Sequence, residues 1–178
     1  MAAMDFFTLP TLTFGVLYCF FVMSHDRRRI LHCNGTKHPS SAWVIQQRNA
    51  FPYDSAPGYL IFDRGANFNE EAVFKVKSFG IQPKRISFRR PWQNGVAERW
   101  LGNCRRDLLD HVIVVNERHL KRLLNEYLSY YHEDRTHLAL DKQTPTGRVP
   151  AKSGGAGCSM ILTTSKLGGL HHRYDLAA

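Results

Sequence analysis

Apolar and polar positions alternate in blocks along the first part of the chain. Three apolar runs are separated by short polar breaks and cover residues 4–9, 14–23 and 28–34. Runs of this length between turn residues are typical of buried strands. The pattern therefore predicts a meander of three strands at the start of the chain.

The stretch from 9 to 23 is also apolar enough to suggest a membrane span or a signal peptide. It contains Pro10 and Gly15, no basic segment precedes it, and it is shorter than the roughly 20 residues that a membrane-crossing helix needs. We therefore favour two buried strands joined by a Pro-Thr turn and expect no membrane association.

Further along the chain, the spacing of apolar residues predicts both helices and strands. Apolar spacing and capping residues predict helices at 42–50, from 69 or 70 to 80, at 96–110 and at 117–131, with strands at 59–62 and 81–87. The segment 88–95 is rich in Arg, Pro, Asn and Gly, which predicts a loop. Together these elements indicate an α/β fold.

Composition limits the domain organisation. A chain of 178 residues with 43% hydrophobic residues can bury one proper core. After Pro145 the sequence shifts to Gly, Ser and Lys, so we expect a core domain at 1–148 and a linker with a short tail at 149–178. The tail can add a strand and a hairpin but is too short to fold alone.

The net charge and the cysteine spacing limit the kinds of binding partner and metal site that are expected. The net charge is +9 and the isoelectric point is near 9.7, which favours a polyanion such as nucleic acid, although many solvated surfaces are equally basic. The four cysteines lie far apart without a Cys-x-x-Cys pair, so reduced thiols in a cytoplasmic protein are expected rather than a zinc site or disulfides.

Three acidic residues occupy places where a solvated carboxylate is not expected. Asp5 interrupts an apolar strand, Asp63 ends the strand 59–62, and Glu98 begins a helix after the loop. One acid at a strand end is more often a turn or cap residue. Three together would be hard oxygen ligands that repel one another unless a cation neutralises them, as in a two-metal site for phosphodiester chemistry.

Several strings carry a family resemblance. IFDRGANF around Asp63 and PWQNGVAERW around Glu98, with thirty-four residues between the two acids, resemble the second aspartate and the glutamate of DDE transposases and retroviral-type integrases. MDFFTL resembles the strand of the first aspartate. YYHEDRTHLALDKQTP and GGLHHRY are similar to segments of bacterial insertion-sequence transposases, so the resemblance covers most of the chain.

The resemblance implies an RNase H-like fold: a five-stranded mixed sheet, with three antiparallel and two parallel strands, and helices on both faces. It also implies that Asp5, Asp63 and Glu98 bind two divalent ions, Mg²⁺ or Mn²⁺, and catalyse strand cleavage and strand transfer. DNA, as element ends and target, is the implied partner of a homo-oligomer, with no small-molecule cofactor. Because relatives carry an upstream helix-turn-helix region, a core without sequence-specific end recognition is expected.

Candidate DNA contacts surround the acids. Helical spacing places Arg105 and Arg106 on the side of Glu98, where they suit a phosphate backbone; the alternative for Arg106 is a surface pair with Asp110. Gln93 and Asn94 can fit around a DNA end, or form a plain turn and N-cap.

A basic stretch before the helix of Glu98 is interleaved with aromatic residues. Arg89 and Arg90 with Phe88 and Trp92 are typical of a surface that binds distorted or single-stranded DNA, unless the rings are tucked inward. Downstream, Arg135 and His137 can orient the last helix or contact DNA, and packing is the favoured role. The His25-Asp26 and His171-His172 pairs are weak metal candidates because adjacent residues on a strand point apart.

Two alternatives remain beside the recombinase hypothesis. A nuclease of the same fold is less favoured because the PWQNGVAER and RTHLAL strings are typical of transposases. The other alternative is a truncated or partly decayed core that binds DNA or dimerises without catalysis, since Gln46-Gln47-Arg48 is one residue short of the family's usual helix.

Overall fold

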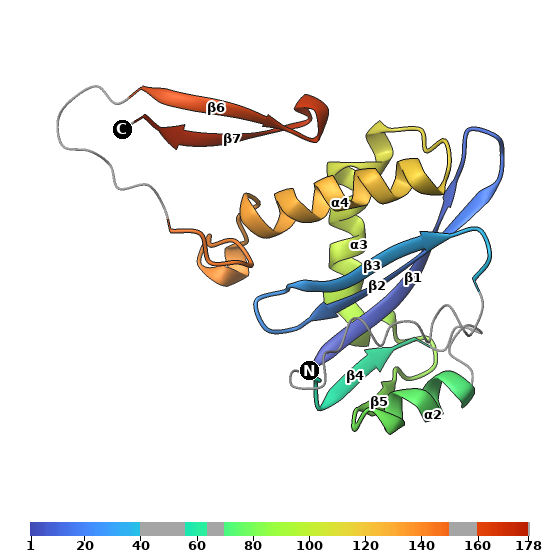
Figure 1. Ribbon diagram of the computed structural model, residues 1–178. Helices are drawn as coiled ribbons and strands as arrows, with labels where there is room; N and C mark the ends of the chain where they lie inside the picture. The colour runs from blue at the N-terminus through green and yellow to red at the C-terminus, as the bar shows by residue number, and fades with distance from the viewer. Residues whose placement is uncertain (40–55, 64–69, 150–159, 178) are drawn as a thin grey trace. The chain divides into compact units, whose positions relative to one another are not determined.

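The computed structural model describes residues 1–39, 56–63, 70–149 and 160–177 (Figure 1). The helix predicted at 42–50, including Gln46–Arg48, lies outside the described residues. The chain forms two compact units, Met1–Arg122 and Leu123–Ala178, and each is described by itself.

A five-stranded mixed sheet forms the first unit. Its strands are β1 (Ala2–Pro10), β2 (Val16–Ser24), β3 (Ile30–Thr36), β4 (Tyr59–Phe62) and β5 (Gln82–Arg85), in the order β3-β2-β1-β4-β5. Strands β1, β2 and β3 pair antiparallel, whereas β4 pairs parallel with both β1 and β5. This topology confirms the predicted RNase H-like α/β fold.

The apolar stretch 9–23 is the end of β1, a turn and most of β2. Thr11 closes the turn: its N–H donates to the Gly15 carbonyl at 2.8 Å, and its Oγ1 accepts the Gly15 N–H at 3.0 Å. The two strands run almost wholly apolar because both faces of the sheet are covered. The prediction of two strands here is confirmed.

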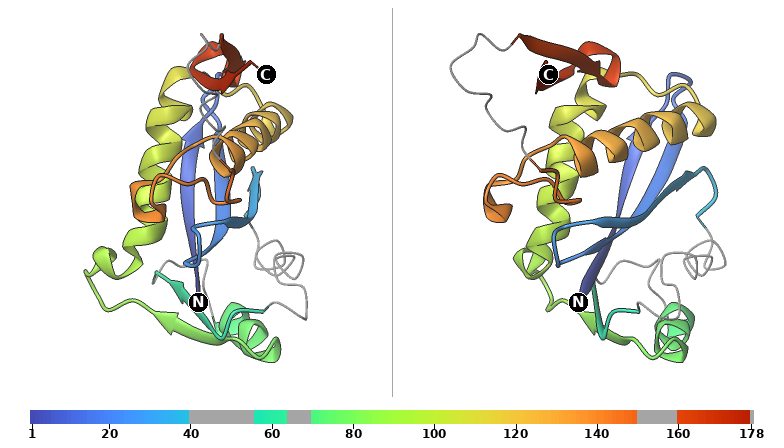
Figure 2. Two further views of the ribbon diagram at one scale, coloured as in Figure 1. Left: turned by 90° about the vertical axis from the view of Figure 1, so that its left-hand side faces the viewer. Right: turned by 60° about the vertical axis from the view of Figure 1, so that its left-hand side comes forward.

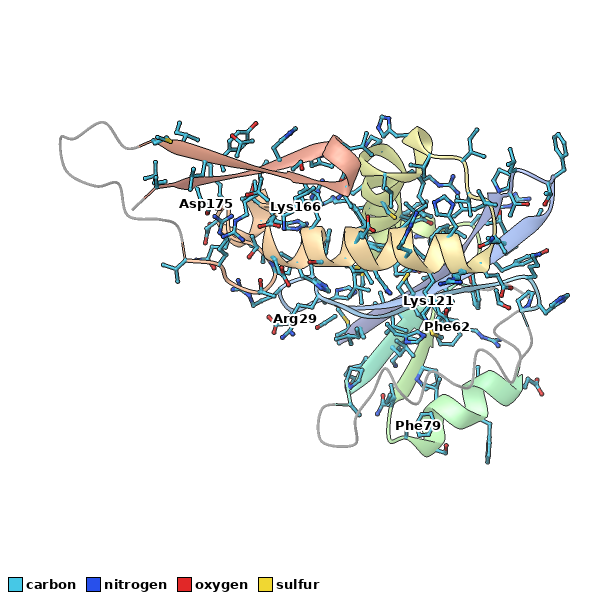
Figure 3. The ribbon with its side chains drawn as sticks, turned by 45° about the horizontal axis from the view of Figure 1, so that its top comes forward. Arg29, Phe62, Phe79, Lys121, Lys166 and Asp175 are labelled. Atoms are coloured by element: carbon cyan, nitrogen blue, oxygen red, sulfur yellow. The ribbon has the colours of Figure 1, made fainter. Side chains whose placement is uncertain are left out.

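One face of the sheet carries a core that helix α2 (Glu70–Ser78) helps to close. Met4, Phe20 and Leu60 belong to its buried cluster, and Val73 and Phe79 pack against it. Phe62, another member of this cluster, is labelled with Phe79 in Figure 3. Gly80 follows α2 with φ +73°, the left-handed value that favours glycine at a helix end, as the sequence predicts.

Helix α3 (Gly95–Asp107) covers the opposite face. Its Trp100 ring lies 4.2 Å from the ring of Phe21 and 6.5 Å from that of Phe7, between centroids. In the left view of Figure 2, α3 lies on one side of strands β1 and β2. The thiols of Cys19 and Cys104 are buried here, and burial raises the pKa of Cys19 to about 12, so it stays a neutral thiol.

Two helices differ from their predicted ends. Helix α3 stops at Asp107 instead of continuing to 110, because Leu108 leaves helical geometry and a short 3-10 turn (Leu109–His111) follows. This break lets the adjacent Leu108 and Leu109 both be buried, which a continuous helix would oppose by turning them about 100° apart. Helix α4 (Glu117–Glu133) runs slightly beyond its prediction. Within the described residues, no helix has the length and apolar character of a membrane span.

The segment 88–95, predicted as a loop, contains a 3-10 helix at Pro91–Asn94 that runs directly into α3. Proline at its first position supplies a preset φ. The Gln93 side chain also folds back, since its Oε1 accepts the Ser87 N–H at 2.7 Å. The loop prediction was therefore wrong for half of this segment, and the approach to Glu98 is ordered.

The second unit contains the remainder of α4 and a hairpin of β6 (Ile161–Lys166) and β7 (His171–Leu176). Asp134 links them: its side chain is only 3% exposed, and it lies 3.0 Å from Lys166 Nζ and 3.3 Å from Arg173 Nη1. Arg148 pairs with both Asp134 and Asp175. Lys166 and Asp175, labelled in Figure 3, belong to the two strands of the hairpin.

We expect Asp134→Ala to loosen this hairpin. The change removes a buried carboxylate that pairs with Lys166 and Arg173. The free energy of unfolding should fall by about 2 kcal/mol, and not more, because both cations are partly solvated. Hydrogen exchange should show faster amide exchange in β6 and β7. Glu126→Ala, an exposed acid of α4, is the control and should leave this exchange unchanged; equal protection in both variants would contradict the prediction.

Candidate active site

Asp5 lies in the central strand of the sheet. It alternates with Met4, which faces the α2 side, so its side chain is on the face that α3 covers. The residue is 7% exposed, and its Oδ1 accepts the Phe6 N–H at 2.8 Å. A carboxyl group in the middle of a buried strand is costly to desolvate, which makes it a candidate for chemistry.

Asp63 follows the end of β4, the parallel neighbour of β1. The strands pair Ala2 with Leu60 and Ala3 with Ile61. Extending this register by two residues places Asp63 level with Asp5 on the same face, and neighbouring strands lie about 4.8 Å apart. The parallel pairing thus brings together two acids that are 58 positions apart in the sequence.

Glu98 is in the first turn of α3 and is exposed. The start of this helix is tied to β1 by Asn94, whose Nδ2 donates to the Met4 carbonyl at 3.2 Å and to Asp5 Oδ2 at 3.4 Å. The helix therefore begins beside Asp5, with Glu98 one turn further on.

Electrostatics link the three acids. Burial raises the pKa of Asp5 from its ordinary 3.8 to about 7; the Phe6 N–H opposes the rise, and the carboxylates of Asp63 and Glu98 add to it. Without a cation, Asp5 thus holds its proton close to neutral pH. Across the described ranges of the chain, no three acidic, imidazole or thiol groups close around one point as a metal shell.

The donor set nevertheless fits a hard divalent cation. Carboxylate oxygens are the ligands that Mg²⁺ and Mn²⁺ prefer. A cation would stabilise the charged form of Asp5, whose pKa is raised chiefly by burial and to a smaller extent by Asp63 and Glu98. Asp63 and Glu98 are thus near enough to Asp5 to contribute to its raised pKa.

Asn94, for which the sequence offered a contact with a DNA end or an N-cap, has its side chain inside the protein. It is 2% exposed, and its amide is used inside the protein, on Met4 and Asp5. No pattern in the sequence indicates this use, because Asn before a helix is explained by capping alone.

Comparison with known proteins identifies the kind of core. Residues 79–145, which include Glu98 and α3, match the family described as "Integrase core domain". The chain is thus similar to an integrase or DDE transposase catalytic core. This confirms the resemblance that the sequence strings carry. A comparison with curated proteins returned no match.

Solved structures support the same fold. The chain is similar to a chain of a simian T-cell lymphotropic virus intasome in complex with PP2A regulatory subunit B56 gamma, with a TM-score of 0.67 and 15% identity, covering 99% of this chain and 66% of that one. It is also similar to the catalytic core of BIV integrase, with a TM-score of 0.57 and 16% identity, over 82% of this chain and 90% of that one.

A third similar structure is the HTLV-2 integrase catalytic core domain in complex with magnesium, in a trimeric form. Its TM-score is 0.58 at 15% identity, over 82% of this chain and 92% of that chain. At these identities the likeness establishes the fold, which agrees with the five-stranded mixed sheet observed here.

In this integrase-like core, the basic stretch before α3 is exposed together with its rings. Phe88 is 70% exposed and Trp92 65%. The guanidinium of Arg89 lies 5.1 Å from the Phe88 ring centre, and that of Arg90 lies 5.7 Å from the Trp92 ring centre. Of the two predicted arrangements, the structure therefore has the rings outside, alternating with cations.

The two arginines of α3 contact their own chain. Arg105 Nη2 donates to the Thr8 carbonyl of β1 at 3.4 Å, and Arg106 Nη2 donates to Asn103 Oδ1 at 2.8 Å. The surface pair of Arg106 with Asp110, considered from the sequence, is replaced by this bond to Asn103. Both guanidinium groups lie on α3 downstream of Glu98.

His137, expected to pack, does so: it is 5% exposed and its ring meets that of Tyr131 edge-on at 4.9 Å. The His171 ring stacks on that of Tyr130, with 4.7 Å between ring centroids. Among the described residues near the acids, Asn94 has a structural use that the sequence did not indicate.

Proposed function

We propose that this chain is the catalytic core of a DDE transposase or integrase that cleaves DNA and joins DNA strands with two divalent metal ions held by Asp5, Asp63 and Glu98. The observation that supports the proposal is the parallel register of β1 and β4, which sets Asp63 level with the buried Asp5. The pKa of Asp5, raised chiefly by burial and to a smaller extent by Asp63 and Glu98, agrees with it. Carboxylates gathered in this way repel one another when ionised, and a bound cation would offset that repulsion.

The chemistry follows from the ligands. When bound, Mg²⁺ or Mn²⁺ would activate a water or a 3′-hydroxyl and stabilise the leaving oxygen of a phosphodiester. Asp5, fixed by the Phe6 N–H and the Asn94 amide, supplies a rigid ligand. Asp63 would share the metals from the neighbouring strand, and the exposed Glu98 would complete the set from its helix.

DNA is the proposed substrate, as element ends and as target, and the active form is proposed to be a homo-oligomer on DNA. The net charge of +9 supports a polyanionic partner. Near the acids, Arg89 and Arg90 offer exposed cations stacked with exposed rings, a combination that binds both phosphate and unstacked bases. Arg105, Arg106 and Gln93 are proposed to add backbone contacts.

We expect Arg89→Ala with Arg90→Ala to weaken DNA binding in a salt-dependent way. Each phosphate contact contributes about 0.9 to the slope of log affinity against log salt, so the slope should fall by about 2. The measurement is fluorescence anisotropy of a labelled duplex between low and moderate salt, in EDTA. Lys121→Ala with Lys142→Ala removes the same charge elsewhere, and an equal change in both double variants would contradict a local contact.

The function is tested with a pre-cleaved DNA end, a target duplex and Mn²⁺. Joined products that require the metal support the recombinase. DNA binding without any joining would favour the alternative of an inactive DNA-binding core. Cutting of the target without joining would favour a nuclease.

A further inference from the structure

Asn94 stands in the N-cap position of α3 without capping it. Asn is favoured there because its side-chain oxygen accepts an N–H of the first helical turn. In this protein the side chain makes no capping bond. Its Nδ2 instead reaches 3.2 Å to the Met4 carbonyl and 3.4 Å to Asp5 Oδ2.

The arrangement is costly for the fold. The residue is 2% exposed, and its Oδ1 is buried without a hydrogen-bond partner among the described residues. Forfeiting a helix cap and burying an unpaired carbonyl are both destabilising. Features that cost stability in this way concentrate at functional sites, where another requirement fixes the geometry.

We propose that Asn94 is a positioning residue that orients the Asp5 carboxylate and sets the distance from β1 to the start of α3, so that Asp5 and Glu98 reach the same metal ions. The inference rests on the proposed function. It assigns to Asn94 an action through another residue, not a contact with the reacting atoms.

Both bonds are needed for this action. The bond to the Met4 carbonyl fixes the β1 backbone next to Asp5, and the bond to Oδ2 fixes the rotation of the carboxylate whose other oxygen accepts the Phe6 N–H. Glu98 follows four residues later, so its position depends on where Asn94 is anchored. Hydrogen-bond partners behind metal ligands typically change metal affinity by about 10- to 100-fold.

The test compares Asn94→Ala and Asn94→Ser with the wild type. Ala removes both bonds; Ser cannot reach Asp5 but is a strong N-cap residue, so it keeps or improves the helix start. We expect calorimetric Mn²⁺ affinity, measured without DNA, to fall about 10- to 100-fold in both variants. The half-saturating Mn²⁺ concentration for strand joining should rise by a similar factor, with joining partly restored by excess Mn²⁺.

Asn116→Ala is the matched control. Asn116 caps α4 in the usual way, since its Oδ1 accepts the His119 N–H at 2.9 Å. Its loss should lower thermal stability without changing Mn²⁺ affinity.

The outcomes separate the possibilities. Unchanged Mn²⁺ affinity in Asn94→Ser, with normal joining, overturns the positioning role and leaves the proposed function intact. Weaker DNA binding in EDTA with unchanged Mn²⁺ affinity also overturns it and makes Asn94 a DNA contact. A wild type that neither binds Mn²⁺ nor joins ends overturns both proposals.

Discussion

Replacing Glu98 with Gln is expected to reduce metal-dependent strand joining by at least about a thousandfold, equivalent to about 4 kcal/mol of transition-state stabilisation. The substitution keeps the size and hydrogen bonding of the side chain but removes the negative charge that would hold a metal ion. Glu98 is exposed, so its loss should leave the fold intact. Asp63→Asn should behave in the same way.

The measurement is single-turnover joining of a pre-cleaved end with Mn²⁺, at protein concentrations that saturate the DNA. Asp26→Asn removes an exposed acid from the turn between β2 and β3 and should retain wild-type joining. DNA affinity in EDTA should not fall in the Glu98 or Asp63 variants, because removing negative charge favours a polyanion. Joining within about tenfold of wild type in Glu98→Gln would remove Glu98 from the proposed site.

The sequence predicted most of the sheet because its signals are local. The apolar runs and their turn residues determine β1, β2 and β3, and Tyr59–Phe62 was predicted with its observed ends. One error arose where tertiary burial overrides local pattern. Helix α3 breaks at Leu108 because two adjacent leucines are both buried. The loop error before α3 has a different cause, a local and exposed bond in which Gln93 Oε1 accepts the Ser87 N–H.

The acidic residues of the candidate site could be proposed from the sequence, whereas the residue that hydrogen-bonds to Asp5 could not. The three acids are conspicuous in the sequence because Asp5 interrupts an apolar strand, Asp63 ends one and Glu98 begins a helix after a loop. Asn94 was missed because its long-range bonds to Met4 and Asp5 depend on a strand 89 residues away, by sequence separation from Asp5. No local pattern distinguishes a capping asparagine from one that holds a carboxylate.

Asp5→Asn is expected to stabilise the metal-free protein while it abolishes joining. The pKa of Asp5 rises from 3.8 in its ordinary state to about 7 on folding, chiefly through burial. A carboxyl whose pKa is raised by folding contributes stability below the unfolded pKa, and this stability is lost as pH rises through the folded pKa. Above pH 7 the charged Asp5 therefore costs the folded state up to about 4 kcal/mol.

Asparagine removes that charge with little change in shape. Its Oδ1 can still accept the Phe6 N–H, and rotation of the Asn94 amide would present the buried Oδ1, which has no partner among the described residues, to the new NH₂ group. That rotation gives up the bond to the Met4 carbonyl, which offsets part of the gain. We therefore expect the free energy of unfolding of Asp5→Asn to exceed that of the wild type by about 2 to 4 kcal/mol at pH 8. At pH 5, where Asp5 is already protonated in the folded state, the gain should shrink to about 1 to 2 kcal/mol.

Urea unfolding in EDTA at pH 5 and pH 8 measures this difference, and the same series with Mn²⁺ tests its cause. A divalent cation that binds only the folded wild type stabilises it by mass action. Mn²⁺ should therefore narrow or reverse the advantage of Asp5→Asn at pH 8, because the variant lacks a charged ligand. If Asp5→Asn were no more stable than wild type at pH 8 in EDTA, or gained as much from Mn²⁺, the stability cost would not arise from a carboxylate kept for metal binding.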